Sequence, residues 1–300
     1  MRVTQSMISN NMLKNLNKSY AELDKYFNQL NTGKKINRPS DDPVAAMNGM
    51  GYRTELSKVG QYQRNTNELH NWFDNSDAAL EQATSGLQRI RYLAVQASNG
   101  TYDEAERKNI AKEVEQIKAD LIDVANTSVN GKYIFNGTDT DNPPIADTDN
   151  DGQIEFAFGT GKVNIEVSAN TELTANIDGN TIFGDSGNGE DLFAVIDKFI
   201  DKLENNNEDN DIDATIGELD KIIDNVVNAR ADLGARMNRL ELVENRLEQQ
   251  EVIATSTLSK NEDVNYAEAI TNLITQQSLH RAALSSGSQI IQPTLLDFLR

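Results

Sequence analysis

The chain has 300 residues, with 28 Lys and Arg against 47 Asp and Glu, so its formal net charge is −19. A surface of that sign repels nucleic-acid phosphates and anionic membranes, and we expect neither as a partner. The absence of cysteine excludes disulfides and thiolate metal sites, and we expect no cofactor. No window approaches the ~20 apolar residues of a transmembrane helix, and the first residues lack the apolar stretch of a cleavable signal.

The N-terminal segment has an unbroken heptad pattern, in which apolar residues alternate at steps of three and four. These residues are Leu13, Leu16, Tyr20, Leu23, Phe27 and Leu30. Pro39 and Pro43 then predict that this helix ends before the next one begins. Between them, Asp42 or Ser40 could cap the following helix, or the Asp41–Asp42 pair could contact a neighbouring molecule.

Two further heptad rows predict the next two helices. The first consists of Leu69, Phe73, Ser76, Leu80, Ala83, Leu87, Ile90, Ala94 and Ala97. The second follows Asp103, a candidate N-cap with Glu106 three residues on. Its members are Ile110, Val114, Ile117, Leu121 and Val124.

The middle of the chain, from about 140 to 188, has strand patterns in place of heptads. Ile154, Phe156 and Phe158 alternate with polar residues. After a turn at residues 159–161 the alternation resumes at Val163, Ile165 and Val167, which predicts that these two runs pair as a β-hairpin.

The heptads return after residue 190. A short helix is predicted around Leu192, Ile196, Phe199 and Leu203. A much longer one follows over residues 219–258, and a helix of that length buries its apolar stripe only against similar helices. The apolar row of this helix is interrupted at Arg230, Glu244 and Glu251. These residues either form polar layers that fix the register, or mark positions where the apolar row shifts around the helix.

Both chain ends are amphipathic, and neither can bury its apolar face alone. The first helix can pair with the last, whose apolar positions include Tyr266, Ile270, Leu273 and Leu284. We therefore predict a mainly α fold, in which both chain ends form a long helical bundle or coiled coil, with an inserted small β-rich domain that projects outward. Such a molecule grows by packing its ends against copies of itself.

The same patterns predict three domains. Residues 1–40 and 265–300 would form a terminal coiled-coil assembly layer, and residues 41–138 and 190–264 a helical core domain. Residues 139–189 would form a projecting β-rich domain.

Two motifs suggest other chemistry and are weak. Asp147, Asp149 and Asp151 match the first half of an EF-hand calcium loop, but the twelfth position is Phe158, where a bidentate carboxylate is needed. An Asx-rich turn explains them more simply, so they stay a weak calcium candidate. Residues 184–187 resemble a protease nucleophile loop, but the two histidines both fall in heptad helices, so we expect no catalytic residue and no enzyme.

Three motifs, in order, resemble the flagellin superfamily. In the first, a helix ends at Gly33, and the chain leads through the Ile36–Asn37 step into the Asp41–Asp42 pair. The second is the helix segment 87–101, and the third is the Leu-Leu-Asp-Phe-Leu-Arg ending at residues 295–300. Residues 40–44 and 132–138 are similar to the branch of the superfamily that joins the flagellar hook to the filament.

This resemblance implies a structural subunit of the bacterial flagellum that forms a ring at the hook–filament junction and templates flagellin polymerisation. Its implied partners are its own copies, the first hook-associated protein, flagellin, and an export chaperone at the C-terminal helix. It also implies an extracellular location, reached through the flagellar secretion apparatus without a cleavable signal. Filament flagellin and a secreted coiled-coil adhesin stay open as alternatives.

The resemblance also places the assembly interface on the N-terminal row, the Asp pair, the second motif and the chain end. Arg89 and Arg91 would either pair with acidic neighbours in the chain or contact a neighbouring subunit. The full predicted set is Leu13, Leu16, Tyr20, Leu23, Phe27, Leu30, Asp41, Asp42, Arg89, Arg91, Gln96, Leu295, Leu296, Phe298 and Leu299.

Overall fold

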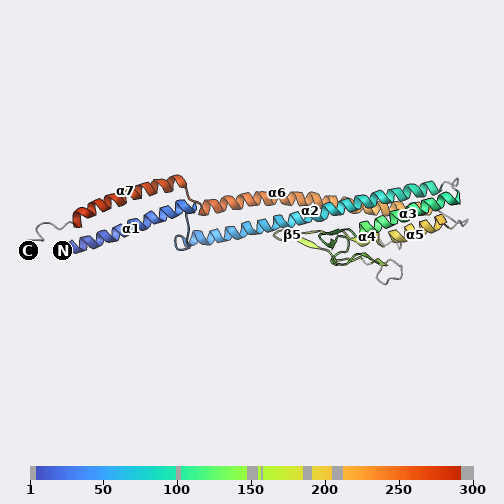
Figure 1. Cartoon of the computed structure of the whole chain (residues 1–300), viewed down its shortest axis with the longest axis horizontal. Helices are drawn as coiled ribbons and strands as arrows, with labels where there is room; N and C mark the ends of the chain where they lie inside the picture. Colours follow the sequence, from blue (N-terminus) through green and yellow to red (C-terminus); the bar gives the residue numbers. More distant parts are fainter. Residues whose placement is uncertain are drawn as a thin grey trace, which may run out of the picture. The chain divides into compact units, whose positions relative to one another are not determined.

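The computed structural model describes residues 5–98, 103–146, 155–156, 158–184, 191–204 and 212–291 (Figure 1). By its contacts the chain divides into two compact units. Unit 1 comprises Met1–Lys58 and Gln250–Arg300, and unit 2 comprises Val59–Gln249. Two long helices, α2 (Pro43–Ser98) and α6 (Ile212–Glu262), contribute to both units. The three domains predicted from the sequence, with their boundaries, stay a prediction.

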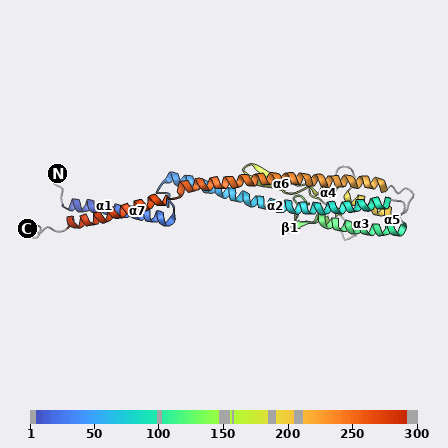
Figure 2. The ribbon, with the colours of Figure 1, turned by 90° about the horizontal axis from the view of Figure 1, so that it is seen from above.

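Unit 1 contains the helix pair predicted from the two chain ends. α1 (Gln5–Thr32) and α7 (Tyr266–Ile291) lie side by side in both views (Figures 1 and 2). α1 ends at Gly33, whose φ of +69° is the left-handed conformation that terminates helices and favours glycine. α2 begins at Pro43, whose fixed φ suits the first helical position, so the predicted break between the helices is confirmed.

The helices of unit 2 bury the heptad rows that the sequence displays. They are α3 (Glu104–Ala125), α5 (Leu192–Glu204) and the remaining lengths of α2 and α6. All nine residues of the predicted 69–97 row have 0% relative exposure. Asp103 is the N-cap of α3, and its backbone N–H donates to Glu106 Oε2 at 3.2 Å, as the capping pattern predicts.

Two of the polar residues that interrupt the α6 seam contact α2, Arg230 through an ion pair and Glu244 through a histidine. Arg230 donates to both carboxylate oxygens of Asp77, with N···O distances of 2.7 and 3.1 Å. Glu244 Oε1 lies 2.9 Å from His70 Nε2. The seam therefore contains polar layers at these positions, one of the two alternatives that the sequence left open.

Among the described residues, the β segments form three two-stranded antiparallel sheets within unit 2. The strands are β1 (Ser128–Val129) with β2 (Lys132–Tyr133), β3 (Ile145–Ala146) with β4 (Glu155–Phe156), and β5 (Asn164–Ser168) with β6 (Thr171–Thr174). The short helix α4 (Gly179–Phe183) follows them.

The predicted pairing of the two alternating runs is wrong. β4 pairs with β3, and β5 pairs with β6 through a turn at Ala169 and Asn170, where Asn170 has a φ of +61°. The glycine segment that was predicted to turn is instead bonded to residues outside it. Gly159 N–H donates to Asn136 Oδ1 at 2.7 Å, and Gly161 O accepts from Asn176 Nδ2 at 2.9 Å.

The β5–β6 hairpin is attached to the long helices of unit 2. Asn65 Nδ2 on α2 donates to the backbone oxygen of Glu166 at 2.7 Å, and Arg236 Nη1 on α6 donates to the backbone oxygen of Asn176, just after β6, at 3.1 Å. Val167 and Leu173 are buried in the same hydrophobic cluster as the helices. The mainly α fold with a small β-rich insertion is therefore confirmed. Among the described residues, no helix is both long and apolar enough to cross a membrane.

Candidate assembly surfaces

The predicted N-terminal row divides into two rows on α1. Leu16, Leu23 and Leu30 are half-buried, and they share a continuous inner row with Met12, Ser19 and Tyr26 at steps of four and three. Leu13, Tyr20 and Phe27 lie beside this row and are 52%, 67% and 63% exposed. The structure therefore places half of the predicted residues on the inner side of the helix pair and half on its surface.

The side of α7 that faces α1 is mostly small or polar. Its buried and half-buried residues recur at heptad steps and are Ala269, Leu273, Gln276, His280, Ala283 and Gly287. Gln276 Nε2 donates to Ser19 Oγ at 3.3 Å, and the rings of His280 and Tyr20 meet edge to face with centroids 5.7 Å apart.

Apart from the half-buried Leu273, the large apolar side chains described on α7 are instead exposed. They are Tyr266, Ile270, Ile274, Leu279 and Leu284. Together with Leu13, Tyr20 and Phe27 of α1, they place eight large apolar side chains on the surface of the pair. Exposed apolar surface of this extent marks an interaction site, so the helix pair has the surface of an element that other molecules cover.

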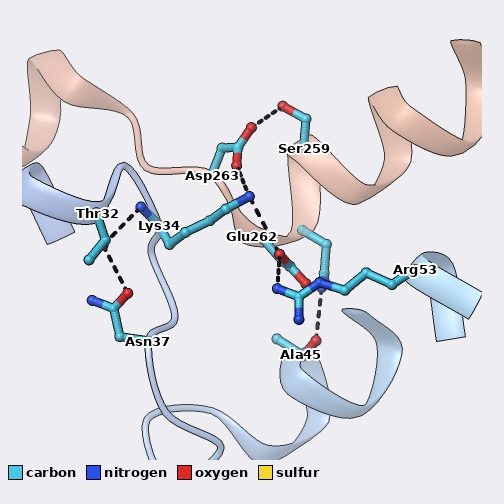
Figure 3. Close-up of polar contacts among 9 residues, drawn as sticks. Thr32, Lys34, Asn37, Ala45, Arg53, Ser259, Glu262 and Asp263 are labelled. Atoms are coloured by element: carbon cyan, nitrogen blue, oxygen red, sulfur yellow. Dashed lines mark hydrogen bonds and ion pairs between the residues drawn. The ribbon is translucent and has the colours of Figure 1, made fainter. Parts of the chain in front are cut away.

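The loop after α1 and the turn before α7 are joined by a polar cluster that we call the latch, formed by Lys34, Arg53, Glu262 and Asp263 (Figure 3). Lys34 Nζ lies 2.7 Å from Asp263 Oδ1 and 3.5 Å from Glu262 Oε2. Arg53 Nη2 lies 2.7 Å from the same oxygen of Glu262. Two charges therefore compensate the carboxylate of Glu262, a residue that is buried.

Backbone hydrogen bonds reinforce the latch. Lys35 N–H donates to Glu262 O at 2.6 Å, and Val264 N–H donates to Gly33 O at 3.0 Å. The hydrogen bond from Lys34 holds the pKa of Asp263 below its usual range, and the hydrogen bond to Asp263 raises the pKa of Lys34. The two helix breaks of unit 1 are thus fixed to each other.

The Asp41–Asp42 pair shapes the loop before α2. Asp42 Oδ1 accepts the N–H groups of Val44 at 3.1 Å and Ala45 at 3.0 Å, which satisfies donors that the first turn of α2 leaves unpaired. Asp41 Oδ2 accepts the N–H groups of Asn37 and Arg38 at 3.2 and 3.0 Å, and these bonds lower the pKa of Asp41. Asp42 is the N-cap, and a contact of the pair with a neighbour stays a prediction.

The predicted arginines of unit 2 pair within the chain. Arg89 Nη2 lies 2.6 Å from Glu113 Oε1, and its guanidinium lies over the ring of Tyr92, 5.3 Å from the centroid. Arg91 bonds to Asp220, which raises the pKa of the arginine and lowers that of the carboxylate. Gln96 lies half-buried further along the same helix. Whether these residues also contact a neighbouring subunit stays a prediction.

Several predicted residues lie outside the part of the chain that the structure describes. They are the calcium candidates Asp147, Asp149 and Asp151 and the C-terminal Leu295, Leu296, Phe298 and Leu299. Within the described ranges, no group of three or more acidic or histidine side chains is arranged to hold a metal ion.

Comparison with known proteins identifies the family. Residues 3–140 match the bacterial flagellin N-terminal helical region, and residues 216–299 match the bacterial flagellin C-terminal helical region. The chain belongs to the flagellin superfamily. It is 28% identical to the flagellar hook-associated protein 3 of Escherichia coli K12 over 93% of both chains. It is also 28% identical to the flagellin of Bacillus subtilis 168 over 97% of both chains.

A solved structure supports the fold independently. A putative flagellar hook-associated protein from Vibrio parahaemolyticus matches with a TM-score of 0.69 and 21% sequence identity. The match covers 74% of this chain and all of that one. At this identity the likeness concerns the fold alone, and the flagellin superfamily fold is what it supports.

Proposed function

We propose that this protein is a structural subunit of the bacterial flagellum that joins the hook-associated layer to the filament and templates flagellin polymerisation. The observation on which this mainly rests is the α1–α7 pair, which leaves large apolar side chains of both helices on the surface. A protein that works alone gains nothing from such a surface, whereas a subunit buries it against its neighbours.

The junction is favoured over the filament by two local motifs and by the relatives. Residues 40–44 and 132–138 resemble the corresponding segments of junction proteins. The chain also matches a flagellar hook-associated protein 3 over nearly its full length. The flagellin of Bacillus subtilis matches at the same identity, so filament flagellin is the second candidate. The two differ in behaviour, because a filament subunit polymerises into long fibres by itself.

The proposed partners are copies of this chain in a ring, the first hook-associated protein on one side and flagellin on the other. Before assembly, an export chaperone would hold the C-terminal helix, and the chain would leave the cell through the flagellar secretion apparatus without a cleavable signal. Its role is structural rather than enzymatic. The predicted chain-end and arginine contacts belong to this proposal.

A deletion strain tests the role. Electron microscopy should show hooks without filaments, and immunoblotting should find monomeric flagellin in the medium, because export continues while nucleation fails. Filaments of normal length in the deletion strain would contradict the junction role. Bare hooks with no flagellin outside the cell would instead identify this chain as the filament subunit.

A further inference from the structure

Charge is distributed very unequally between the two units. Unit 1 contains 12 Lys and Arg against 10 Asp and Glu, whereas unit 2 contains 16 against 37. Their net charges are therefore +2 and −21, which together give the −19 of the whole chain. Unit 2 accounts for more than the entire negative charge, and unit 1 is slightly basic.

Three of the twelve cationic residues of unit 1 line a pocket at the end of α1. This pocket has a volume of about 430 Å³ and lies between the last turns of α1 and the loop that follows. Lys25, Lys35 and Arg38 line it. All three side chains are exposed, and none forms a salt bridge with the described residues. The pocket therefore presents three cationic groups to the solvent.

The two carboxylates that line the same pocket already have partners. Asp41 Oδ2 accepts two backbone N–H groups, and Asp24 Oδ2 accepts from Asn28 Nδ2 at 3.1 Å. These hydrogen bonds hold the carboxylates against their own helix and loop. Arg38 and Lys25 also act on Asp41 through their charges. Three cations against two carboxylates leave the pocket a net charge of +1 with which to attract an acidic partner from outside.

We propose that this pocket receives acidic side chains from unit 2 of a neighbouring copy of the chain. The proposal rests on the proposed function only in requiring an assembled ring. Two units of charge −21 repel each other when copies pack closely, and a contact between unit 2 and the basic pocket replaces part of that repulsion with attraction. Charge complementarity of this kind sets the register between subunits and disfavours the incorrect registers.

The sign of the salt dependence separates this contact from its alternative. If unit 2 meets the pocket of a neighbour, added salt screens an attraction and weakens the association of copies. If like-charged units face each other, added salt screens a repulsion and strengthens the association. Junctions isolated with the full-length chain should therefore release more of this protein as NaCl is raised, and greater retention would contradict the proposal.

Carbodiimide coupling identifies the contact directly, because it joins a lysine amine to a carboxylate only where the two touch. Isolated junctions should yield covalent dimers of this chain on a denaturing gel. Mass spectrometry should find amides from Lys25 or Lys35 to an Asp or Glu within residues 59–249. Lys14 and Lys18, which are exposed on α1 outside the pocket, are the internal controls and should give none.

Any other coupling pattern overturns the proposal. Amides from the pocket lysines to flagellin would identify a different occupant. Amides in the dimer band to acids of unit 1 other than Asp24 and Asp41, which line the same pocket, would identify a contact between like units. Dimers formed only through Lys14 or Lys18, or no dimers, would show that no acidic segment of a copy occupies the pocket.

Charge reversal provides the functional test. The double variant Lys25→Glu/Lys35→Glu should reduce incorporation into flagella roughly tenfold or more, because like charges would then meet in the contact. Lys14→Glu/Lys18→Glu changes the net charge equally and should have less than a twofold effect. Equal effects of the two variants would refute the pocket while leaving the junction role, which the deletion strain tests, untouched.

Discussion

Both units contain helices with a heptad pattern, but they differ in how far they bury the apolar residues of that pattern. In unit 2, the predicted row on α2 is completely buried, because α3, α5 and α6 supply enough surface to cover it. In unit 1, only two helices pair, and three of the six predicted residues on α1 remain more than half exposed. A heptad row thus shows that a helix will be covered, but not whether its own chain covers it.

The difference has an energetic consequence. Burying a Leu or Phe side chain is worth about 1.5–3 kcal/mol, and unit 2 gains this from many residues within one molecule. Unit 1 gains less, since isolated amphipathic helices are marginal in water. We therefore expect unit 2 to be stable in the monomer and unit 1 to become fully ordered only when neighbours cover it.

The largest effect on the monomer is expected from Phe73→Ala in the buried row of α2. The cavity should lower the free energy of unfolding of unit 2 by about 3–5 kcal/mol. The single tryptophan, Trp72, is buried in the same unit and reports urea unfolding by its fluorescence. Phe27→Ala is the matched control, and an equally large shift there would contradict the comparison of the units.

Much of the fold could be predicted from the sequence because heptads report helices directly. The rows in unit 2, the N-cap at Asp103 and the break before Pro43 were all evident as local patterns. The β pairing was not, since Ile154, Phe156 and Phe158 alternate in the same way whichever strand they meet. Tertiary hydrogen bonds at Gly159 and Gly161 decided it.

The latch also could not be predicted from the sequence, because its contacts join residues that are far apart in the chain. Lys34 was visible within a family motif, but its partner Asp263 is 229 residues away and lies beyond the end of a long helix. Nothing local distinguishes that aspartate from the chain's many other acids. The true inner row of α1 was also missed, because Ser19 is polar and Tyr20 beside it is the more obvious apolar residue.

A smaller effect is expected from Asp42→Ala, which removes the N-cap of α2 in unit 1. Losing a capping carboxylate costs about 0.5–2 kcal/mol of local helix stability. The amides of Val44 and Ala45 donate hydrogen bonds to Asp42, so their hydrogen exchange should accelerate in the variant. Ser40→Ala removes the other candidate cap and should leave both rates unchanged; acceleration in that variant would assign the cap to the serine.

Lys34→Met should have a still smaller effect on unit 1. Because the side chains of Lys34 and Asp263 are 38% and 43% exposed, solvent screening limits the ion pair to under about 1 kcal/mol. Protection of the Val264 amide against hydrogen exchange should fall by less than tenfold. Lys260→Met, an exposed lysine on α6, removes the same charge and should leave this amide unaffected.

The same variant tests how the stability of the latch depends on pH. The pKa of Asp263 is lowered below 3.8, so the pair contributes at neutral pH and its contribution disappears as the pH falls through the folded-state value. The pKa of Lys34 is raised above 10.5, so the contribution is also lost at still higher pH. The acid-dependent loss of Val264 protection should be smaller in Lys34→Met, where only the hydrogen bond from Ser259 still lowers the pKa of Asp263; an unchanged profile would assign it to other groups.

The smallest effect on the monomer, and the sharpest contrast between the units, is expected from Phe27→Asp. The side chain is 63% exposed, so the charge meets solvent and the Trp72 unfolding curve should not move. In an assembly the same charge would be buried without a partner, which costs several kcal/mol and should abolish incorporation into flagella. Asn17→Asp adds an identical charge at another exposed position of α1 and should incorporate normally. Normal incorporation of Phe27→Asp would mean that the exposed row of α1 stays in water, and that unit 1 is covered elsewhere.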